Sequence, residues 1–410
     1  NLQLKLTKPD LIILEKNTLA KKLRYFKKYI YINDIFKNYL KNINSINKKI
    51  NFMSKDFIVT LSSGTTSLPK PIVYDQKIKY MRFIQMKKIF KIKKGDDIFS
   101  VSPIDHSLGQ RLLFLALLNG SNFVYISKYD LRMIKNLSSE FNFKFTCLPS
   151  NHLHLLKKNL LNKSVKIKKI VSAASTLTDY DKRVLINNNI NLFEMYGAAE
   201  IGTVTSINFK KNKNLIGSVG KTLKNIDIKI INEKNKFLEH GSIGEIVCKT
   251  PLRFKYYYDN IKLTKDSFVG EYFKTGDLGK QDRNKNLFFL SRKQDVIISS
   301  GKNIYPIDIE KELLKLKYIK EAAVIGLKDK FFGEVVFAVC VTNSRNKNIE
   351  AKTRKDLQKS ISRFQMPLGF SFINKLPKNN LGKIQKYLLR KKYNEKKYDF
   401  TKSLRKILNK

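Results

Sequence analysis

Short apolar runs alternate with an apolar helical stretch between residues 97 and 149, and this alternation leaves few architectures open to the chain. The predicted helix covers residues 110–119. Two more apolar runs, at 167–172 and 191–196, are predicted to be buried strands. Because strands that alternate with helices usually form a largely parallel sheet covered by helices, this part of the chain is predicted to be an α/β domain.

Shorter runs of alternating apolar and polar residues replace this pattern after residue 217. The runs IDIKIIN, GEIVCKT and NLFFLSR are separated by polar turn sequences such as NEKNK, which is typical of antiparallel strands. After residue 292, the order helix 307–316, strand 319–327, strand 334–342 and helix 352–363 predicts a small α+β unit. The boundary between the two units is predicted within SRKQDV, residues 291–296.

The two ends of the chain are rich in lysine. Residues 19–40 are predicted to form one or two helices, followed by a strand at 57–61 and a helix at 77–91. A basic helix is predicted after residue 389.

Basic residues greatly outnumber acidic ones: Lys and Arg total 81, Asp and Glu total 34, and the formal net charge is +47. Such a charge invites a nucleic-acid-binding interpretation. Lysine is, however, spread along the whole chain together with asparagine and isoleucine, which indicates an AT-rich coding bias. The sequence has no zinc finger, RNP motif or heptad zipper, so specific nucleic-acid binding is the weakest alternative. The charge still favours acidic partners such as ATP, CoA or an acidic acyl carrier protein.

The cysteines and the hydropathy pattern exclude several classes of protein. Cys147, Cys248 and Cys340 lie far apart, which offers neither a disulfide framework nor the ligand spacing of a zinc site. The apolar run at 112–118 is far shorter than the ~20 residues of a membrane-spanning helix. No stretch near residue 1 has the charged start and apolar centre of a signal peptide. These features predict a cytoplasmic protein without a transmembrane segment.

A loop rich in hydroxyl residues, SSGTTSLPK at residues 62–70, directly follows the predicted strand at 57–61. Backbone N–H groups and hydroxyls in such a loop can cradle phosphate oxygens, and Lys70 adds positive charge. The GK[ST] ending of a Walker loop is absent. Taken alone, the loop indicates either phosphate binding or a simple linker.

Four further motifs follow this loop in order: EMYGAAE at 194–200, TGD at 275–277, LSRKQDVIISSGKNIYPIDIE at 290–310 and LPKNNLGKIQKYLLR at 376–390. Together with the loop, they resemble the motifs of the adenylate-forming (AMP-binding) superfamily. This superfamily includes acyl-CoA synthetases, luciferases and peptide-synthetase adenylation domains. The resemblance is to the acyl-CoA synthetase type, with a shortened N-terminal region.

The resemblance implies a fold and a reaction. The fold is a large N-terminal α/β domain with a barrel-like antiparallel part over residues 1–291, a hinge at 292–295 and a small mobile C-terminal α+β lid over 296–410. In the reaction, a carboxylate attacks the α-phosphorus of ATP to give an acyl-AMP and pyrophosphate, and a thiol, predicted to be that of CoA, then attacks the acyl-AMP. Positioning and charge neutralisation should dominate such catalysis.

The resemblance also implies which residues form the site. The catalytic residues are Lys383, Glu200, Thr66 and His106, and Mg²⁺ would be held by Glu200 and Thr66. The residues that would bind ATP are Ser62, Ser63, Gly64, Thr65, Thr66, Lys70, Ala173, Ala174, Ser175, Glu194, Met195, Tyr196, Gly197, Ala198, Asp277, Arg292 and Lys383. Rotation of the lid would replace Lys383 by a thiol-binding turn formed by Ser300, Gly301 and Lys302.

Several of these residues also have a plainer interpretation from the sequence alone. A tyrosine after a strand, such as Tyr196, is more often part of a core. The TGD that contains Asp277 is also good turn chemistry. His106 would face the acyl pocket or gate the thiol tunnel, but an ordinary buried or surface histidine fits equally well.

The sequence departs from the family pattern in places. Ser67 and Pro71 replace glycines of the phosphate loop, and Ala199 replaces the threonine of YGxTE, which removes one hydrogen bond. The leader before the loop is shorter than in relatives. The predicted activity is the activation of a fatty or aryl acid and its transfer to CoA. Three alternatives stay open: transfer to a carrier-protein phosphopantetheine, amino-acid adenylation, and a non-catalytic nucleotide-binding homologue.

Overall fold

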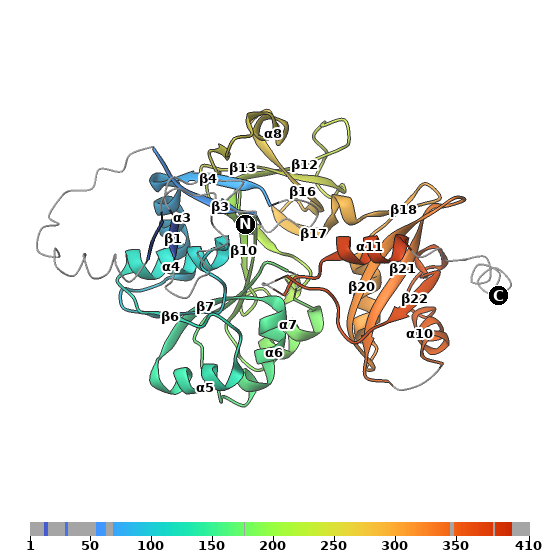
Figure 1. Ribbon diagram of the computed structural model, residues 1–410, viewed down its shortest axis with the longest axis horizontal. Coiled ribbons are helices and arrows are strands. Elements are labelled where there is room, and N and C mark those ends of the chain that lie inside the picture. Colours follow the sequence, from blue (N-terminus) through green and yellow to red (C-terminus); the bar gives the residue numbers. More distant parts are fainter. Residues whose placement is uncertain are drawn as a thin grey trace, which may run out of the picture.

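The computed structural model describes residues 12–14, 29–31, 55–62, 69–175, 177–344, 348–379 and 382–395. Figure 1 shows a larger unit, drawn in blue to yellow, beside a smaller unit drawn in orange and red. The larger unit is built on one long mixed sheet, and the smaller unit on a sheet of five strands. This arrangement confirms the predicted fold class, a large α/β domain followed by a small α+β domain.

Parallel strands form one half of the long sheet. In order across the sheet they are β9 (Leu192–Ala198), β8 (Ile170–Ala173), β7 (Phe143–Pro149), β5 (Asp97–Ser100) and β6 (Phe123–Tyr125). Most of their side chains are buried, because helices cover the sheet. Strands β8 and β9 confirm the two buried strands predicted at 167–172 and 191–196.

The helices of this half agree with the sequence in part. Helix α3 (Gln76–Phe90) confirms the helix predicted at 77–91, and α4 (Ser107–Asn119) the one predicted at 110–119. The prediction of one helix between residues 97 and 149 is wrong, because α5 (Leu131–Glu140) is a second one. This helix packs Leu131, Ile134 and Leu137 against the core, but its other residues are mostly polar and exposed, so it is an amphipathic surface helix and not an apolar one like α4. Two further helices, α6 (Ser150–Leu161) and α7 (Asp179–Asn187), follow in the chain.

Antiparallel strands continue the same sheet beyond β9, as the alternating pattern after residue 217 predicts. They are β10 (Gly202–Asn208), β11 (Gly220–Thr222), β17 (Asn286–Arg292), β16 (Tyr272–Gln281), β13 (Gly244–Lys249) and β12 (Asp227–Ile231), with β15 (Phe268–Val269) paired to β16. A separate three-stranded sheet contains β3 (Asp56–Leu61), β4 (Pro71–Asp75) and β14 (Tyr256–Tyr257). Strand β3 confirms the strand predicted at 57–61, and the short helix α8 (Ile261–Asp266) follows β14.

The small unit contains an antiparallel pair of long strands at its centre, β20 (Ile319–Asp329) and β21 (Gly333–Thr342). The other elements are β18 (Ile297–Ser299), β19 (Lys302–Ile304), α9 (Pro306–Lys315), α10 (Ile349–Leu357), β22 (Gly369–Phe372) and α11 (Lys386–Asn394). One apolar cluster lies under α9 and α10, and a second packs against α11. The helix predicted over 352–363 covers Ile349–Leu357 instead, and a separate 3₁₀ turn, Arg363–Gln365 with Ser362 as its cap, follows later.

Strand β2 (Tyr29–Tyr31) corrects a prediction near the start of the chain. It pairs in parallel with β1 (Ile12–Leu14), whereas the sequence pattern predicts helix over residues 19–40. Aromatic and β-branched residues such as Tyr-Ile-Tyr favour extended backbone, and this local preference explains the error. The remainder of that predicted stretch lies outside the described residues.

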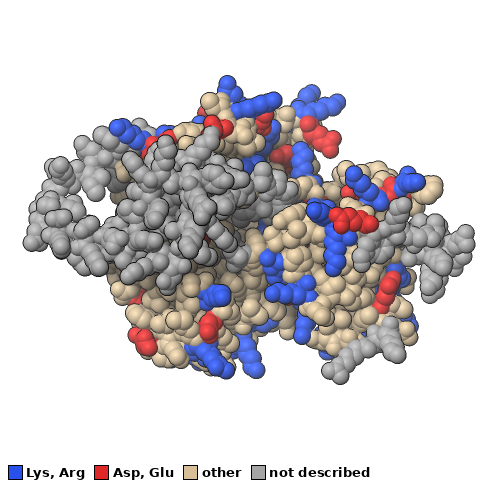
Figure 2. Space-filling model, viewed as in Figure 1, with Lys and Arg blue, Asp and Glu red and all other residues tan. Residues whose placement is uncertain are grey.

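Basic side chains are scattered over both units on the face drawn in Figure 2, with acidic side chains among them, rather than gathered into one patch. On this face, the distribution agrees with a general lysine bias. All three cysteines are free and buried. Within the described ranges, no helix combines the length and the apolar character needed to cross a bilayer.

Candidate active site

The carboxyl ends of the parallel strands open onto a cavity of about 460 Å³. Strand β8 ends at Ala173 and β9 at Ala198, and both residues line the cavity. Ligands of open α/β sheets usually bind at this edge. The predicted site residues that line the cavity are Ser62, Lys70, His106, Ala173, Ala174, Met195, Gly197, Ala198, Glu200, Arg292 and Lys383.

Ser62 and Lys70 close the neck of the predicted phosphate loop. The Ser62 backbone N–H donates to the Lys70 carbonyl at 2.9 Å, and the Lys70 N–H donates to Ser62 Oγ at 2.9 Å. Strands β3 and β4 pair in antiparallel fashion on either side, so the sheet fixes where the loop begins and ends. Ser63, Gly64, Thr65 and Thr66 lie outside the described residues. Their predicted phosphate and metal contacts stay predictions.

Glu200 and Lys70 are joined through Tyr257, a residue that the sequence analysis missed. The Tyr257 hydroxyl donates to Glu200 Oε1 at 2.9 Å. The Lys70 ammonium lies 5.3 Å from the centre of the Tyr257 ring, close enough for a cation–π contact. The three side chains therefore form one polar wall of the cavity. Nothing in the FKYYYD stretch distinguishes Tyr257 from its neighbours, because only the fold turns it toward Glu200.

A second polar corner contains Asp277, Arg292 and Tyr196. The Arg292 Nε lies 2.9 Å from Asp277 Oδ1, and the Tyr196 hydroxyl donates to Asp277 Oδ2 at 2.7 Å. Burial raises the pKa of Asp277, an effect that the Arg292 charge opposes. Arg292 lines the cavity, whereas Asp277 and Tyr196 are not among the lining residues. The structure thus shows their contacts with each other and with Arg292, and their binding to ATP stays a prediction.

Lys383 reaches the cavity from the small unit. It follows Gly382, which has a φ of +74°, and a Cβ added there would lie 1.8 Å from Asn151 Nδ2 in α6. Glycine therefore allows the turn to approach the large unit closely. Burial, and then the nearby Arg292, lower the pKa of Lys383 to about 8, while Asp277 acts in the opposite direction.

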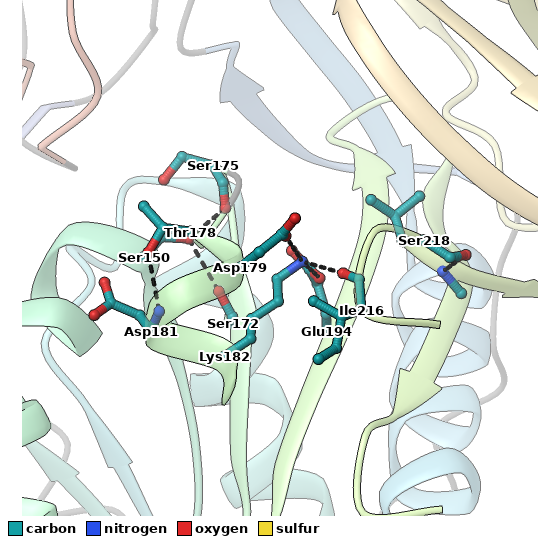
Figure 3. A network of polar contacts seen from close by, with 12 residues as sticks. Ser150, Ser172, Ser175, Thr178, Asp179, Asp181, Lys182, Glu194, Ile216 and Ser218 are labelled. Carbon is teal, nitrogen blue, oxygen red and sulfur yellow. Dashed lines mark hydrogen bonds and ion pairs between the residues drawn. The ribbon is translucent and has the colours of Figure 1, made fainter. Parts of the chain in front are cut away.

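Glu194 does not line the cavity, although the motif resemblance places it among the ATP-binding residues. Figure 3 shows its side chain facing Lys182 of α7. The Lys182 Nζ lies 2.6 Å from Glu194 Oε2 and donates to the Ile216 carbonyl at 3.0 Å. Both side chains are buried. The carboxylate of Glu194 is thus held in an internal ion pair between α7 and β9.

The remaining predicted residues lie at the margin. Ser175 is exposed and is not among the lining residues, although its carbonyl accepts a hydrogen bond from Ser150 Oγ. Ser300, Gly301 and Lys302 lie at the exposed turn between β18 and β19, away from the cavity. A thiol-binding role for this turn therefore requires the lid rotation that the resemblance implies.

Glu245 of β13 is another lining residue that the sequence analysis missed. Its carboxylate pairs with Lys293 Nζ at 2.9 Å and accepts the Gly276 N–H at 3.2 Å. A signal was present, since Glu245 is the only acidic residue in the apolar run GEIVC. It connects the TGD segment with the residues predicted to form the hinge.

Comparison with known proteins gives the same fold. The ATP-bound MatB from Rhodopseudomonas palustris has a TM-score of 0.88 to this chain at 23% sequence identity, with 96% of this chain and 81% of that chain covered. The 2-succinylbenzoate–CoA ligase of Listeria monocytogenes is 27% identical over 343 residues, which cover 83% of this chain and 71% of that protein. The long-chain-fatty-acid–CoA ligase FadD13 of Mycobacterium tuberculosis is 24% identical over 345 residues, with 82% and 68% covered.

Two family models match the chain in the order that the motifs predict. The model of the AMP-binding enzyme matches residues 19–258, and that of the AMP-binding enzyme C-terminal domain matches residues 308–383. The first match alone covers more than half of the 410 residues. The resemblance drawn from the five motifs is confirmed, and the chain belongs to the family of AMP-binding enzymes.

Proposed function

We propose that this protein activates a carboxylic acid with ATP and transfers the acyl group to CoA. In the first step, a carboxylate oxygen bonds to the α-phosphorus of ATP and the bond to pyrophosphate breaks. In the second, the CoA sulfur bonds to the acyl carbon, AMP leaves, and the thiol proton passes to solvent. The acid is proposed to be a fatty or aryl acid, and the buried free cysteines fit action in the reducing cytoplasm.

One observation supports this proposal above the others. A single cavity is lined by Ser62 and Lys70 from the predicted phosphate loop, by Glu200 after β9, by Arg292 after the TGD segment and by Lys383 of the lid. These residues are separated by up to 321 positions along the chain, from 62 to 383. Cations and a carboxylate that converge on one cavity suit a reaction in which phosphate charge must be positioned and neutralised.

The roles of the residues follow from where they lie in the cavity. Ser62 and Lys70 would hold the terminal phosphates. Lys383 would bridge the acid carboxylate and the α-phosphate, since its ammonium is brought in by the lid. Rotation about residues 292–295 would then withdraw Lys383 and bring the turn at Ser300 to Lys302 toward the cavity for thiol attack.

Mg²⁺ fits the site as a partner of ATP rather than as an ion held by the protein alone. Among the described residues, no group of three or more His, Cys, Asp or Glu side chains could form a metal site. Glu200 supplies one carboxylate next to Lys70, and Mg²⁺ commonly binds through one carboxylate together with substrate phosphates and water. When bound, the ion would neutralise phosphate charge, and Glu200 would orient it.

Replacing Glu200 by glutamine is therefore expected to raise the Mg²⁺ concentration needed for half-maximal acyl-AMP formation, on the order of 100-fold. The neutral amide keeps the size of the side chain but loses the charge that attracts the cation. The measurement is a titration of acid-dependent ATP–pyrophosphate exchange with Mg²⁺ at fixed ATP. Glu233→Gln, at an exposed position, is the matched control and should leave the titration unchanged. An unaltered Mg²⁺ requirement in Glu200→Gln would contradict the metal role.

The pH dependence of acyl-AMP formation should report the state of Lys383. Because its pKa is lowered to about 8, the ammonium form prevails below pH 8 and is lost above it. We expect kcat/KM for ATP in the exchange reaction, which reports the free enzyme, to be nearly constant from pH 6.5 to about 7.5 and to fall tenfold per pH unit above about 8.5. A Lys383→Arg enzyme that retains exchange should show no such alkaline fall, because guanidinium stays charged. A wild-type kcat/KM for ATP that is unchanged up to pH 10 would contradict this assignment.

The proposed activity is tested by acid-dependent ATP–pyrophosphate exchange with a panel of fatty, aryl and amino acids, followed by thioester formation with CoA or a carrier-protein phosphopantetheine. Exchange with a fatty or aryl acid and a thioester with CoA are the expected results. Exchange only with amino acids would replace the proposed substrate class. Binding of ATP by folded protein without exchange for any acid would indicate a non-catalytic homologue instead.

A further inference from the structure

We infer that the acid activated at this site carries a second carboxylate, which Arg111 binds where helix α4 lines the cavity. This inference rests on the proposed function and narrows its substrate to a dicarboxylic acid. It is drawn from a group of three basic side chains, Lys79, Arg82 and Arg111, for which acyl-AMP formation itself has no use. We call this group the cation cluster.

The cation cluster lies where helices α3 and α4 pack together in the large unit, at the left of Figure 1. The Lys79 ammonium is 3.9 Å and the Arg82 guanidinium carbon 4.7 Å from the centre of the same ring, Tyr74. Arg111 lies within the electrostatic reach of Arg82 and lines the same small hollow as Lys79 and Arg82. Lys79 and Arg82 are almost fully buried.

Acidic partners are lacking within the described part of the chain. None of the ion pairs there includes a member of the cation cluster. Lys79 donates to the neutral side chain of Gln110, and Arg82 donates to the carbonyls of Leu252 and Glu200. These neutral acceptors satisfy donors but cancel no charge. Buried cations in natural proteins are usually paired, so this cluster differs from an ordinary structural network.

Arg111 is the member of the cluster that a ligand can reach. It lines both the small hollow beside Lys79 and the main cavity. Of its five N–H donors, the described residues show one in use, from Nη1 to Thr203 Oγ1 at 2.7 Å. That bond holds the guanidinium at the cavity wall. Among the contacts that the structure describes, the other N–H groups of Arg111 have no acceptor and can donate to a ligand in the cavity.

The surroundings of Arg111 in the main cavity suit the body of an acid rather than a nucleotide. The neighbouring lining side chains include Leu108 and Met195, which are apolar. The phosphate-loop neck at Ser62 and Lys70 and the lysine of the lid provide the cations that ATP and the reacting carboxylate need. Arg111 is thus a further cation of the cavity, and apolar as well as polar side chains line the cavity with it. A planar carboxylate matches the two parallel N–H groups of a guanidinium.

The electrostatics of the cluster agree with this arrangement. Burial, and then the charges of Arg82 and Arg111, lower the pKa of Lys79 to about 6. Burial and the charge of Arg82 lower the pKa of Arg111 to about 10. Lys79 is therefore largely neutral at pH 7, whereas the Arg111 guanidinium stays charged, and an anion next to Arg111 would balance this remaining charge. An acid that ends in a methyl group would leave the charge uncompensated.

The test compares acids that differ only in the second carboxylate, in ATP–pyrophosphate exchange with purified full-length protein. The pairs are adipate with hexanoate and terephthalate with benzoate. The wild-type enzyme should show kcat/KM about 30-fold higher or more for the dicarboxylic member of at least one pair, because one charged hydrogen-bonded pair contributes a factor of about 10 to 100. Arg111→Gln should lose this preference through a higher KM, while exchange with the monocarboxylic member stays within about threefold.

Two controls keep the outcomes separate. Arg132→Gln removes the same charge from the exposed surface of α5 and should preserve the preference. Thermal unfolding of each variant shows whether it is folded. A wild-type enzyme that uses monocarboxylic acids equally well or better would overturn the inference and leave the proposed function standing. Equal losses for both members of a pair in folded Arg111→Gln would also overturn it. The absence of exchange with every acid would instead count against the proposed function.

Discussion

Replacing Lys383 by alanine should reduce acyl-AMP formation by about 1,000-fold, while transfer of a supplied acyl-AMP to CoA falls less than about fivefold. The lysine is half-buried at the cavity, and among the described residues of the small unit it is the basic side chain that lines the cavity. Its charge would be needed while the carboxylate and the α-phosphate approach each other. It would not be needed once the acyl-AMP exists and the lid has rotated. Single-turnover measurements of the two half-reactions separate these steps.

The matched control for this prediction is Lys375→Ala, which removes an exposed lysine from the same unit eight residues earlier. It should leave both half-reactions unchanged. Equal losses in the two half-reactions of Lys383→Ala would show that the lysine supports the fold or ATP binding in general. That result would contradict the proposal that the lid rotates between the two half-reactions.

The fold was predictable from the sequence wherever the burial pattern was regular. The strands β8 and β9 are apolar runs because both of their faces are covered, and a run of that kind is visible without a structure. Helix α5 was not predicted because it is a short surface helix whose apolar stripe has only three residues, Leu131, Ile134 and Leu137. Strand β2 was not predicted because three residues are too few for a periodic pattern, although Tyr-Ile-Tyr favours extended backbone locally.

Some residues of the candidate site could be predicted from the sequence, and others could not. Glu200, Arg292 and Lys383 could be proposed because each lies within a motif, and the fold does bring them to one cavity. Tyr257 and Arg111 could not, because they lie outside all five motifs and reach the cavity only through tertiary packing. For Glu194, the motif predicts a position at the cavity that the structure does not show. A motif places it beside Tyr196, but alternation along β9 turns its side chain away from the cavity and toward α7.

Replacing Lys182 by methionine should destabilise the large unit by about 3–5 kcal/mol, the largest loss of stability that we expect from one substitution outside the cavity. The methionine fills similar space but leaves the Glu194 carboxylate buried without its cation, and the Ile216 carbonyl loses a donor (Figure 3). Burial already raises the pKa of Glu194, and Lys182 opposes that rise. Urea unfolding followed by circular dichroism measures the loss.

The same variant should show a characteristic pH dependence. Without Lys182, the Glu194 carboxyl binds its proton more tightly in the folded than in the unfolded protein, so its folded pKa lies above its unfolded value. Below the unfolded pKa, near 4.5, both states are protonated and the penalty is absent. The destabilisation relative to wild type should therefore grow as the pH rises above about 5. A loss of stability that does not change with pH would point to lost packing instead of an unpaired charge.

A double substitution tests whether the Lys182–Glu194 pair stabilises the fold or contributes to ATP binding. In Lys182→Met/Glu194→Leu, both charges are gone, and removal of a whole buried pair is often nearly neutral. The double variant should therefore recover most of the stability lost in Lys182→Met and should bind ATP with an affinity close to wild type, because Glu194 does not line the cavity. If stability is recovered but ATP affinity falls tenfold or more, Glu194 contributes to ATP binding, as its motif suggests. Unrecovered stability would mean that the two charges are not coupled as their 2.6 Å separation requires.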